Sequence, residues 1–216
     1  KPKFHKLMSK SRAINVLSAA RLFLFGARDV WLVVALPVFL SESLGWDFWR
    51  VGGFLALWVI GYGGVQSIAP RLVGKRGDGV PNADRAPVWA AALAVVPLAM
   101  AVLLANGLAS PAVVLVVGLG LFGVLFAINS SLHSYMIVAH AAEDGVSLDV
   151  GFYYMANAMG RLIGTVLSGW IFQTWGLATC LAWSAAFVLV AAALSLALPR
   201  LPEAAAHMSI KENSGD

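Results

Sequence analysis

Three ionisable residues lie in the middle of long apolar segments: Arg28 and Asp29 share one segment, and Arg161 lies in another. A charge in the interior of a membrane is costly, so intramembrane ionisable residues mark functional sites by default. Arginine also presents a planar fork of donors that suits carboxylates, phosphates and other oxyanions. The three residues therefore predict that the chain handles an anion inside a membrane.

The depth of each arginine follows from the rise of an α-helix. Arg28 lies about 20 Å from the start of its segment, and Arg161 about 17 Å from the start of its own. If the two segments run in the same direction, both guanidiniums lie at one level near the membrane midplane. Neighbouring side chains on a helix point about 100° apart, so we expect Arg28 and Asp29 not to form a simple pair. Asp29 would instead reach Arg161 or carry a proton; in a structural alternative, both arginines are tied to Asp29 or to backbone carbonyls.

The segment that contains Arg161 also carries a polar stripe. Its members recur every three or four residues and share one helical face: Tyr154, Asn157, Arg161, Thr165 and Ser168. Gly160, Gly164 and Ser168 form a ladder of small residues that permits close helix packing. We expect the glycines to pack against another helix while Asn157 and Arg161 face a cavity.

Two further segments contribute polar candidates. Asn129 and His133 lie four residues apart in one, and Gln66 lies in the other. A histidine titrates near neutral pH, which suits a proton relay, but His133 is equally an interhelical hydrogen-bond partner. The predicted substrate contacts are Arg28, Arg161, Asn157, Gln66, Asn129 and Tyr154, and the predicted proton-coupling residues are Asp29 and His133. Arg21, nearer the start of its segment, is expected to snorkel to the lipid headgroups.

Composition places these residues in a polytopic membrane protein. The 216-residue chain is 60% hydrophobic and only 12% charged, whereas a soluble domain carries about a quarter charged residues. The formal net charge of +4 reflects basic residues in loops, so it indicates topology and not nucleic-acid binding. The single cysteine, Cys180, excludes an internal disulfide framework. We find no metal cluster, no nucleophile–base arrangement and no nucleotide-binding motif, so we expect neither an enzyme nor a cofactor.

The elements that must position the charges are six predicted transmembrane helices, each near the roughly 20 residues that cross a bilayer. Their ranges are 15–40, 51–73, 87–105, 112–138, 150–174 and 177–198. They form the expected bundle over 15–199, flanked by a basic linker, 1–14, and a tail, 200–216. Lys and Arg cluster on one side of the bundle, which predicts that both of these ends lie in the cytoplasm. The expected location is the inner membrane. The chain does not begin with Met and shows no cleavable leader, so we expect a fragment that begins inside a longer protein.

This plan resembles the C-terminal half of a major facilitator superfamily transporter. Spans one to three and four to six look like a repeated three-helix unit, in which the third helix is the least polar. In that family the first, second, fourth and fifth helices of the half line the path, which matches the polar distribution here. Residues 71–78, RLVGKRGD, resemble a degenerate form of the family's basic loop motif.

Two stretches resemble the arsenic-resistance permeases of the ArsJ type. They are residues 15–31, NVLSAARLFLFGARDVW, and residues 151–162, GFYYMANAMGRL. The resemblance implies efflux of 1-arseno-3-phosphoglycerate, which forms when arsenate replaces phosphate in glycolysis. This substrate carries several oxyanion groups, which suits arginines at the midplane.

We therefore expect an exporter of a phosphorylated organoarsenical, coupled to protons by exchange. Its expected partners are the small anionic substrate, the lipid bilayer and a missing N-terminal half of six helices; no nucleic acid is expected. The alternatives are a major facilitator exporter of another organic anion, drug or sugar phosphate, and a membrane protein that transports nothing.

Overall fold

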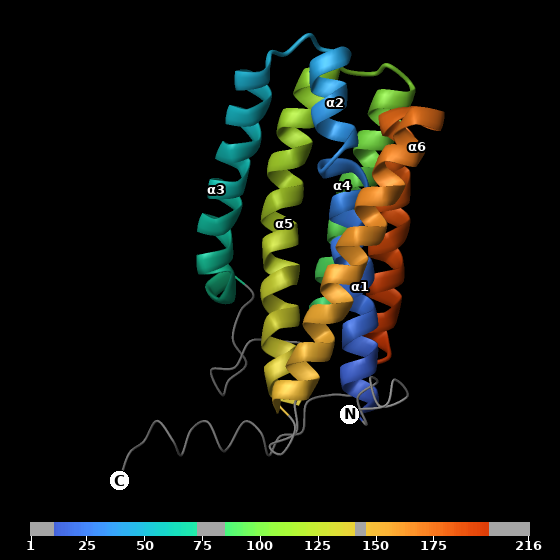
Figure 1. Ribbon diagram of the computed structural model, residues 1–216. Coiled ribbons are helices and arrows are strands. Elements are labelled where there is room, and N and C mark those ends of the chain that lie inside the picture. Colours follow the sequence, from blue (N-terminus) through green and yellow to red (C-terminus); the bar gives the residue numbers. More distant parts are fainter. Residues whose placement is uncertain (1–10, 73–84, 141–145, 199–216) are drawn as a thin grey trace.

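The structure is a computed structural model that describes residues 11–72, 85–140 and 146–198. These ranges form six helices and contain no strand: α1 Arg12–Leu32, α2 Ala35–Glu42, α3 Phe48–Leu72, α4 Ala86–Ala105, α5 Pro111–His140 and α6 Val146–Leu196 (Figure 1). The expected all-α fold is confirmed for this part of the chain. The N-terminal linker up to residue 10, most of the basic loop motif, residues 141–145 and the C-terminal tail lie outside the described residues.

In the described part of the chain, five helical stretches are long and apolar enough to cross a membrane, with α1 and α2 counted as one. The break between α1 and α2 falls at Val33 and Val34. Pro37 explains this break, because proline has no N–H to donate to the carbonyl four residues earlier, and its ring clashes with that carbonyl. Ser168 of α6 compensates locally, since its Oγ accepts a hydrogen bond of 3.1 Å from the backbone N–H of Ala35.

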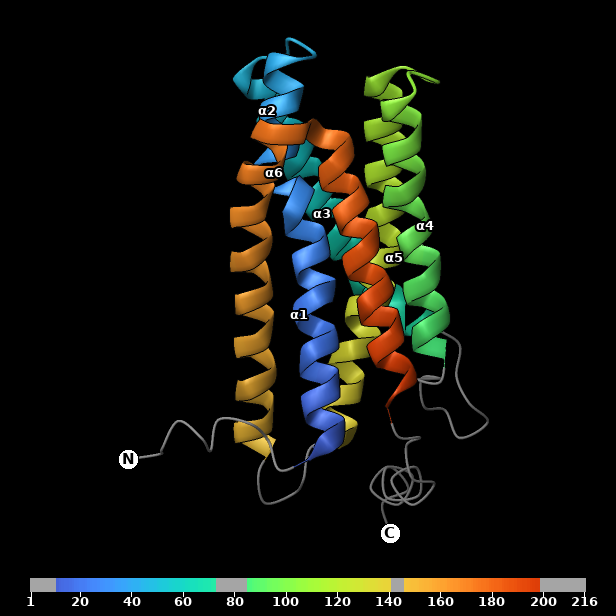
Figure 2. The same cartoon turned by 90° about the vertical axis from the view of Figure 1, so that its right-hand side faces the viewer.

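Helix α6 is a hairpin of two arms. Its 51 residues would measure about 76 Å if straight, more than twice the hydrocarbon thickness. The backbone leaves the helical conformation at Gly176, where φ is 79°, a region that glycine enters without a steric penalty. Figure 2 shows the second arm returning along the bundle. The thiol of Cys180 on the second arm lies 3.8 Å from the Ser168 carbonyl on the first.

Helix α1 lies inside the bundle and packs chiefly on both arms of α6 (Figure 2). Helix α4 packs on α6 and on α5. Helix α3 packs mainly on α5, at the edge of the bundle (Figure 1). The indole N–H of Trp58 on α3 donates to the Leu119 carbonyl on α5 at 2.9 Å. Much of α3 is open, and a Cβ built at Gly61, Gly63 or Gly64 meets no described atom within 4 Å.

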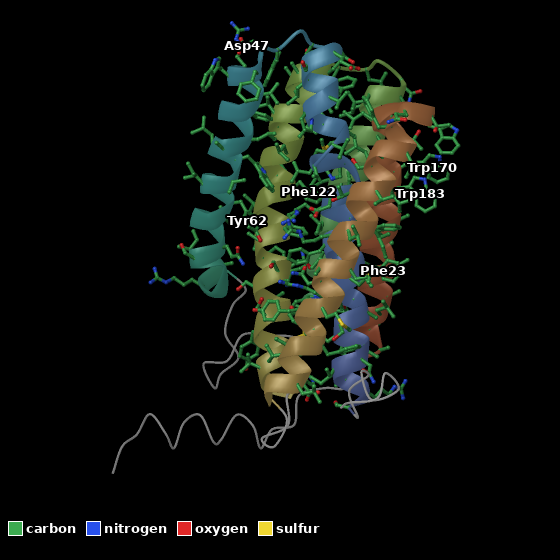
Figure 3. All side chains as sticks on the ribbon, in the orientation of Figure 1. Phe23, Asp47, Tyr62, Phe122, Trp170 and Trp183 are labelled. Carbon is green, nitrogen blue, oxygen red and sulfur yellow. The ribbon has the colours of Figure 1, made fainter. Side chains whose placement is uncertain are left out.

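Aromatic side chains in edge-to-face contact fill the interior between α1 and α5. Trp31 meets Phe122 with ring centroids 5.3 Å apart, and Phe25 meets Phe126 at 5.1 Å. In Figure 3, Phe122 lies inside the bundle, whereas Trp170 and Trp183 project outward from α6. Both tryptophans are about half exposed, as expected for side chains that face lipid.

The interface between α1 and the first arm of α6 is very close. A Cβ built at Gly160 would collide with the Leu22 carbonyl, and one at Gly164 would lie 2.6 Å from the Gly26 carbonyl oxygen. Only glycine permits this approach at these two positions. The predicted packing role of the glycine ladder is therefore confirmed.

Candidate functional site

The close packing of α1 and α6 brings the three opening residues together in what we call the Asp29 cluster: Arg28, Asp29 and Arg161. The Asp29 side chain is 1% exposed and accepts hydrogen bonds on both carboxylate oxygens. Arg28 Nε donates to Oδ1 at 2.6 Å, and Arg161 Nε donates to Oδ2 at 3.1 Å. One buried carboxylate thus bridges a guanidinium from each helix.

The position of Asp29 depends on the glycine contacts beside it. A Cβ at Gly164 would lie 3.2 Å from Asp29 Cβ, so the carboxylate stands directly against the first arm of α6. Arg161 is three residues before Gly164 and lies on a neighbouring part of the same helical face. The Arg28 and Arg161 side chains therefore reach one carboxylate, which confirms the prediction that these residues lie at one level.

The expectation that Arg28 and Asp29 do not pair is wrong. The 100° separation describes where the Cα–Cβ bonds point, and a long arginine side chain can fold back toward its neighbour. The expected contact between Asp29 and Arg161 is present. The cluster therefore combines both possibilities, with the carboxylate shared between the two arginines.

The two guanidiniums differ in exposure. The Arg28 side chain is 14% exposed, and its Cζ lies 5.1 Å from the centre of the Phe25 ring and 5.4 Å from that of Phe126. The Arg161 side chain is 55% exposed. Arg161 therefore forms the accessible part of the cluster, and Arg28 forms its inner part beside two aromatic rings.

The cluster retains positive charge and donors. Two guanidiniums against one carboxylate leave one formal positive charge. Asp29 engages only the Nε atoms, and no other described residue hydrogen-bonds to the Nη groups of Arg28 or Arg161. Nη groups in a planar fork are the donors that bind an oxyanion in bidentate fashion. The arrangement can thus receive an anionic group in a largely apolar setting, where electrostatic attraction is strong.

Asn157 is the predicted polar residue nearest to this cluster in sequence on α6. It lies one turn before Arg161, is partly buried, and its side-chain oxygen has no hydrogen-bond partner among the described residues. Tyr154 lies about two turns before Arg161, is 53% exposed and packs against Tyr153. Both residues share the α6 face of Arg161, but no hydrogen bond joins them to the cluster in the described structure.

Gln66 and Asn129 are not brought to the cluster. Gln66 lies on α3, which packs mainly on α5, and none of its described contacts is polar. Asn129 is fully buried, and its amide donates to the carbonyls of Trp89 on α4 and Leu125 on α5, at 3.0 and 2.9 Å. Asn129 thus ties α5 to α4 and serves packing in this structure.

His133 and Arg21 form a second polar region, separate from Asp29. His133 is 1% exposed, and its predicted role as a proton relay is not accompanied by any contact with Asp29. The expectation that Arg21 snorkels is wrong, because its side chain is 4% exposed and donates to the carbonyl oxygen of Ser130 at 3.1 Å. Depth along a helix does not tell which face a residue occupies, and Arg21 faces α5 instead of lipid.

Comparison with protein-family models and with curated proteins finds no match to this chain. The assignment of the site therefore depends on the residues and their geometry.

Proposed function

We propose that this chain is the C-terminal half of a major facilitator superfamily transporter that exports a multiply anionic, phosphorylated organoarsenical, 1-arseno-3-phosphoglycerate. The Asp29 cluster is the observation that supports an anionic substrate. In this cluster a buried carboxylate accepts hydrogen bonds from two guanidiniums through their Nε atoms alone. Their terminal groups remain for an oxyanion. The choice of an organoarsenical rests on the resemblance of residues 15–31 and 151–162 to the ArsJ-type permeases.

On binding, the substrate oxyanion would partly replace the Asp29 carboxylate as the partner of the two arginines. An incoming oxyanion first meets Arg161, whose side chain is 55% exposed, and then Arg28, whose side chain is 14% exposed. The oxyanion repels the Asp29 carboxylate and competes with it for the same guanidiniums. Asn157, one turn from Arg161, would add a hydrogen bond from its amide nitrogen.

Asp29 would link anion binding to protons. A proton on the carboxylate cancels its charge and weakens its hold on both arginines, so protonation and oxyanion binding favour each other. Export of an anion is also favoured by a cytoplasm-negative potential, by about 2.3 kcal/mol per charge for each 100 mV. The proton would therefore bind together with the anion, which differs from the exchange expected from the sequence, and the membrane potential would contribute to outward movement.

The helical architecture supports a six-crossing half. The five long apolar stretches become six crossings when the hairpin of α6 is counted as two. In the proposed topology the chain lies in the inner membrane with both ends in the cytoplasm, and it rocks against an N-terminal half around the central site. The half-exposed Arg161 would face that second half.

The cargo is tested by growth of arsenate-sensitive cells that express the intact transporter. We expect protection against arsenate and none against arsenite, because only arsenate enters the phosphorylated adduct. Arg28→Gln should abolish the protection, whereas Arg50→Gln, at an exposed ion pair with Asp47, should preserve it. Protection that is equal for arsenite, or that survives Arg28→Gln, would contradict the proposal.

A further inference from the structure

Arg21 is a buried cation for which no described residue supplies a carboxylate. Its side chain lies between the Phe25 ring, 4.0 Å from Cζ, and the Tyr153 ring, 5.0 Å from Cζ. Nη1 donates to the carbonyl and the hydroxyl of Ser130 at 3.1 and 3.3 Å. The buried Nε has no partner in the described structure. Such a group is costly unless something else completes its hydrogen bonds.

Two more buried polar groups beside Arg21 also lack a hydrogen-bond partner among the described residues. Ser18 lies one turn earlier on α1, and neither its Oγ nor the Nδ1 of His133 has a hydrogen-bond partner among the described residues. His133 lies one turn after Ser130 on α5, within electrostatic range of Arg21. Because α1 and α5 run in opposite directions (Figure 1), both groups lie on the same side of the Arg21–Ser130 contact.

All three unpartnered atoms can donate a hydrogen bond. An arginine Nε is only a donor, a serine hydroxyl can donate, and an imidazole nitrogen donates in the appropriate tautomer or when protonated. Several donors around a positive charge, with no carboxylate among the described residues nearby, match the requirements of an oxyanion group.

Phe25 connects this region to the Asp29 cluster. Its ring lies 4.0 Å from Arg21 Cζ and 5.1 Å from Arg28 Cζ, so the two guanidiniums share one aromatic ring. Arg21 and Arg28 are seven residues apart, which is about two turns or 10 Å along the helix. A substrate with two anionic groups could therefore interact with both arginines.

We propose that Arg21, Ser18 and His133 form a second oxyanion site that binds the other anionic group of the substrate while the Asp29 cluster binds the first. The inference rests on the proposed function and deepens it, because it makes the transporter selective for substrates with two anionic groups. Tyr153 covers the Arg21 guanidinium on the α6 side, so binding requires this ring to move.

The test compares two probes on the purified full-length transporter by calorimetry: inorganic phosphate, with one anionic group, and 3-phosphoglycerate, with two. Arg21→Gln is expected to weaken 3-phosphoglycerate binding about tenfold, the effect of one charge-assisted hydrogen bond, and to change phosphate binding less than about twofold. Ser18→Ala, a smaller change, should weaken 3-phosphoglycerate binding in the same selective way.

Two results would overturn the second site. Unchanged affinity for both probes in Arg21→Gln would mean that water, and not substrate, accepts the free hydrogen bonds around Arg21. An equal loss of affinity for both probes would place Arg21 in the first site. Arg28→Gln separates this failure from failure of the proposed function, because it should weaken both probes if the Asp29 cluster binds anions. Thermal unfolding serves as the folding control, because affinities are compared only between variants that remain folded.

Discussion

In the proposed site, Asp29 would limit how strongly the two arginines attract an anion. Its carboxylate is almost fully buried and contacts both guanidiniums, so it neutralises part of the charge that an oxyanion would use. The pairing of Asp29 with Arg161 could be predicted from helix geometry. The pairing with Arg28 could not, because the course of a flexible side chain is set by its surroundings, here the faces of Phe25 and Phe126.

We predict that Asp29→Asn strengthens oxyanion binding at neutral pH. The substitution resembles the protonated carboxyl group, so the arginines are released for the ligand. Inorganic sulfate is a suitable probe because its own charge does not change near neutral pH. The variant should bind sulfate about tenfold more tightly than wild type at neutral pH.

The matched control is Glu42→Gln, which removes an exposed carboxylate at the end of α2. It should leave the sulfate affinity unchanged. If Asp29→Asn bound sulfate more weakly than wild type, Asp29 would position the two arginines and would not compete with the anion for them.

At the scale of helices, the glycine contacts between α1 and α6 hold the site together. We predict that Gly160→Ala destabilises the protein by about 1–3 kcal/mol, because the new methyl group would collide with the Leu22 carbonyl on α1. The measurement is thermal unfolding of the purified transporter.

Gly120→Ala is the control for helix propensity, since a Cβ at Gly120 on α5 meets no described atom within 4 Å. It should leave the unfolding midpoint unchanged or raise it slightly. Equal midpoints for the two variants would show that α1 and α6 are less closely packed than the structure indicates.

A second prediction concerns the break between α1 and α2. Ser168→Ala removes the hydroxyl that accepts from the Ala35 N–H, so a buried donor loses its partner at a cost of about 1–3 kcal/mol. Ser195→Ala on the second arm of α6 is the comparison, because Ser195 donates only to the Ala191 carbonyl of its own helix. A smaller loss of stability for Ser168→Ala than for Ser195→Ala would argue against this role.

The sequence contains enough information to predict most of the helices but not all of their breaks. The reversal at Trp175-Gly176 is marked by a glycine, and the structure has positive φ there. The break at Val33 and Val34 lies inside a predicted span, and its signal, Pro37, stands four residues later. Contacts between distant helices, such as that of Asn129 with Trp89, leave no pattern in the local sequence. They could be identified only from the tertiary structure.

At the scale of the molecule, the proposed topology predicts opposite labelling of two ends of the bundle. Cysteine introduced at Ser43, between α2 and α3, should react with an impermeant maleimide in intact cells. Cysteine at Arg85, before α4, should react only after permeabilisation. Both positions are exposed, and a Cys180→Ala background removes the only thiol of this chain. Reaction at Arg85 in intact cells would contradict the orientation.

The central claim is that Arg161 binds the transported anion, and the most direct measurement is transport into everted membrane vesicles. Labelled arsenate is supplied with glyceraldehyde 3-phosphate, NAD+ and the glycolytic enzyme that forms the phosphorylated adduct, and uptake is followed in vesicles that contain the intact transporter. We predict that Arg161→Glu abolishes uptake and that Arg161→Lys retains part of it, because lysine keeps the charge but not the bidentate fork. Arg50→Glu, a charge reversal at an exposed ion pair, should transport normally. Uptake by Arg161→Glu at the wild-type rate would contradict the account.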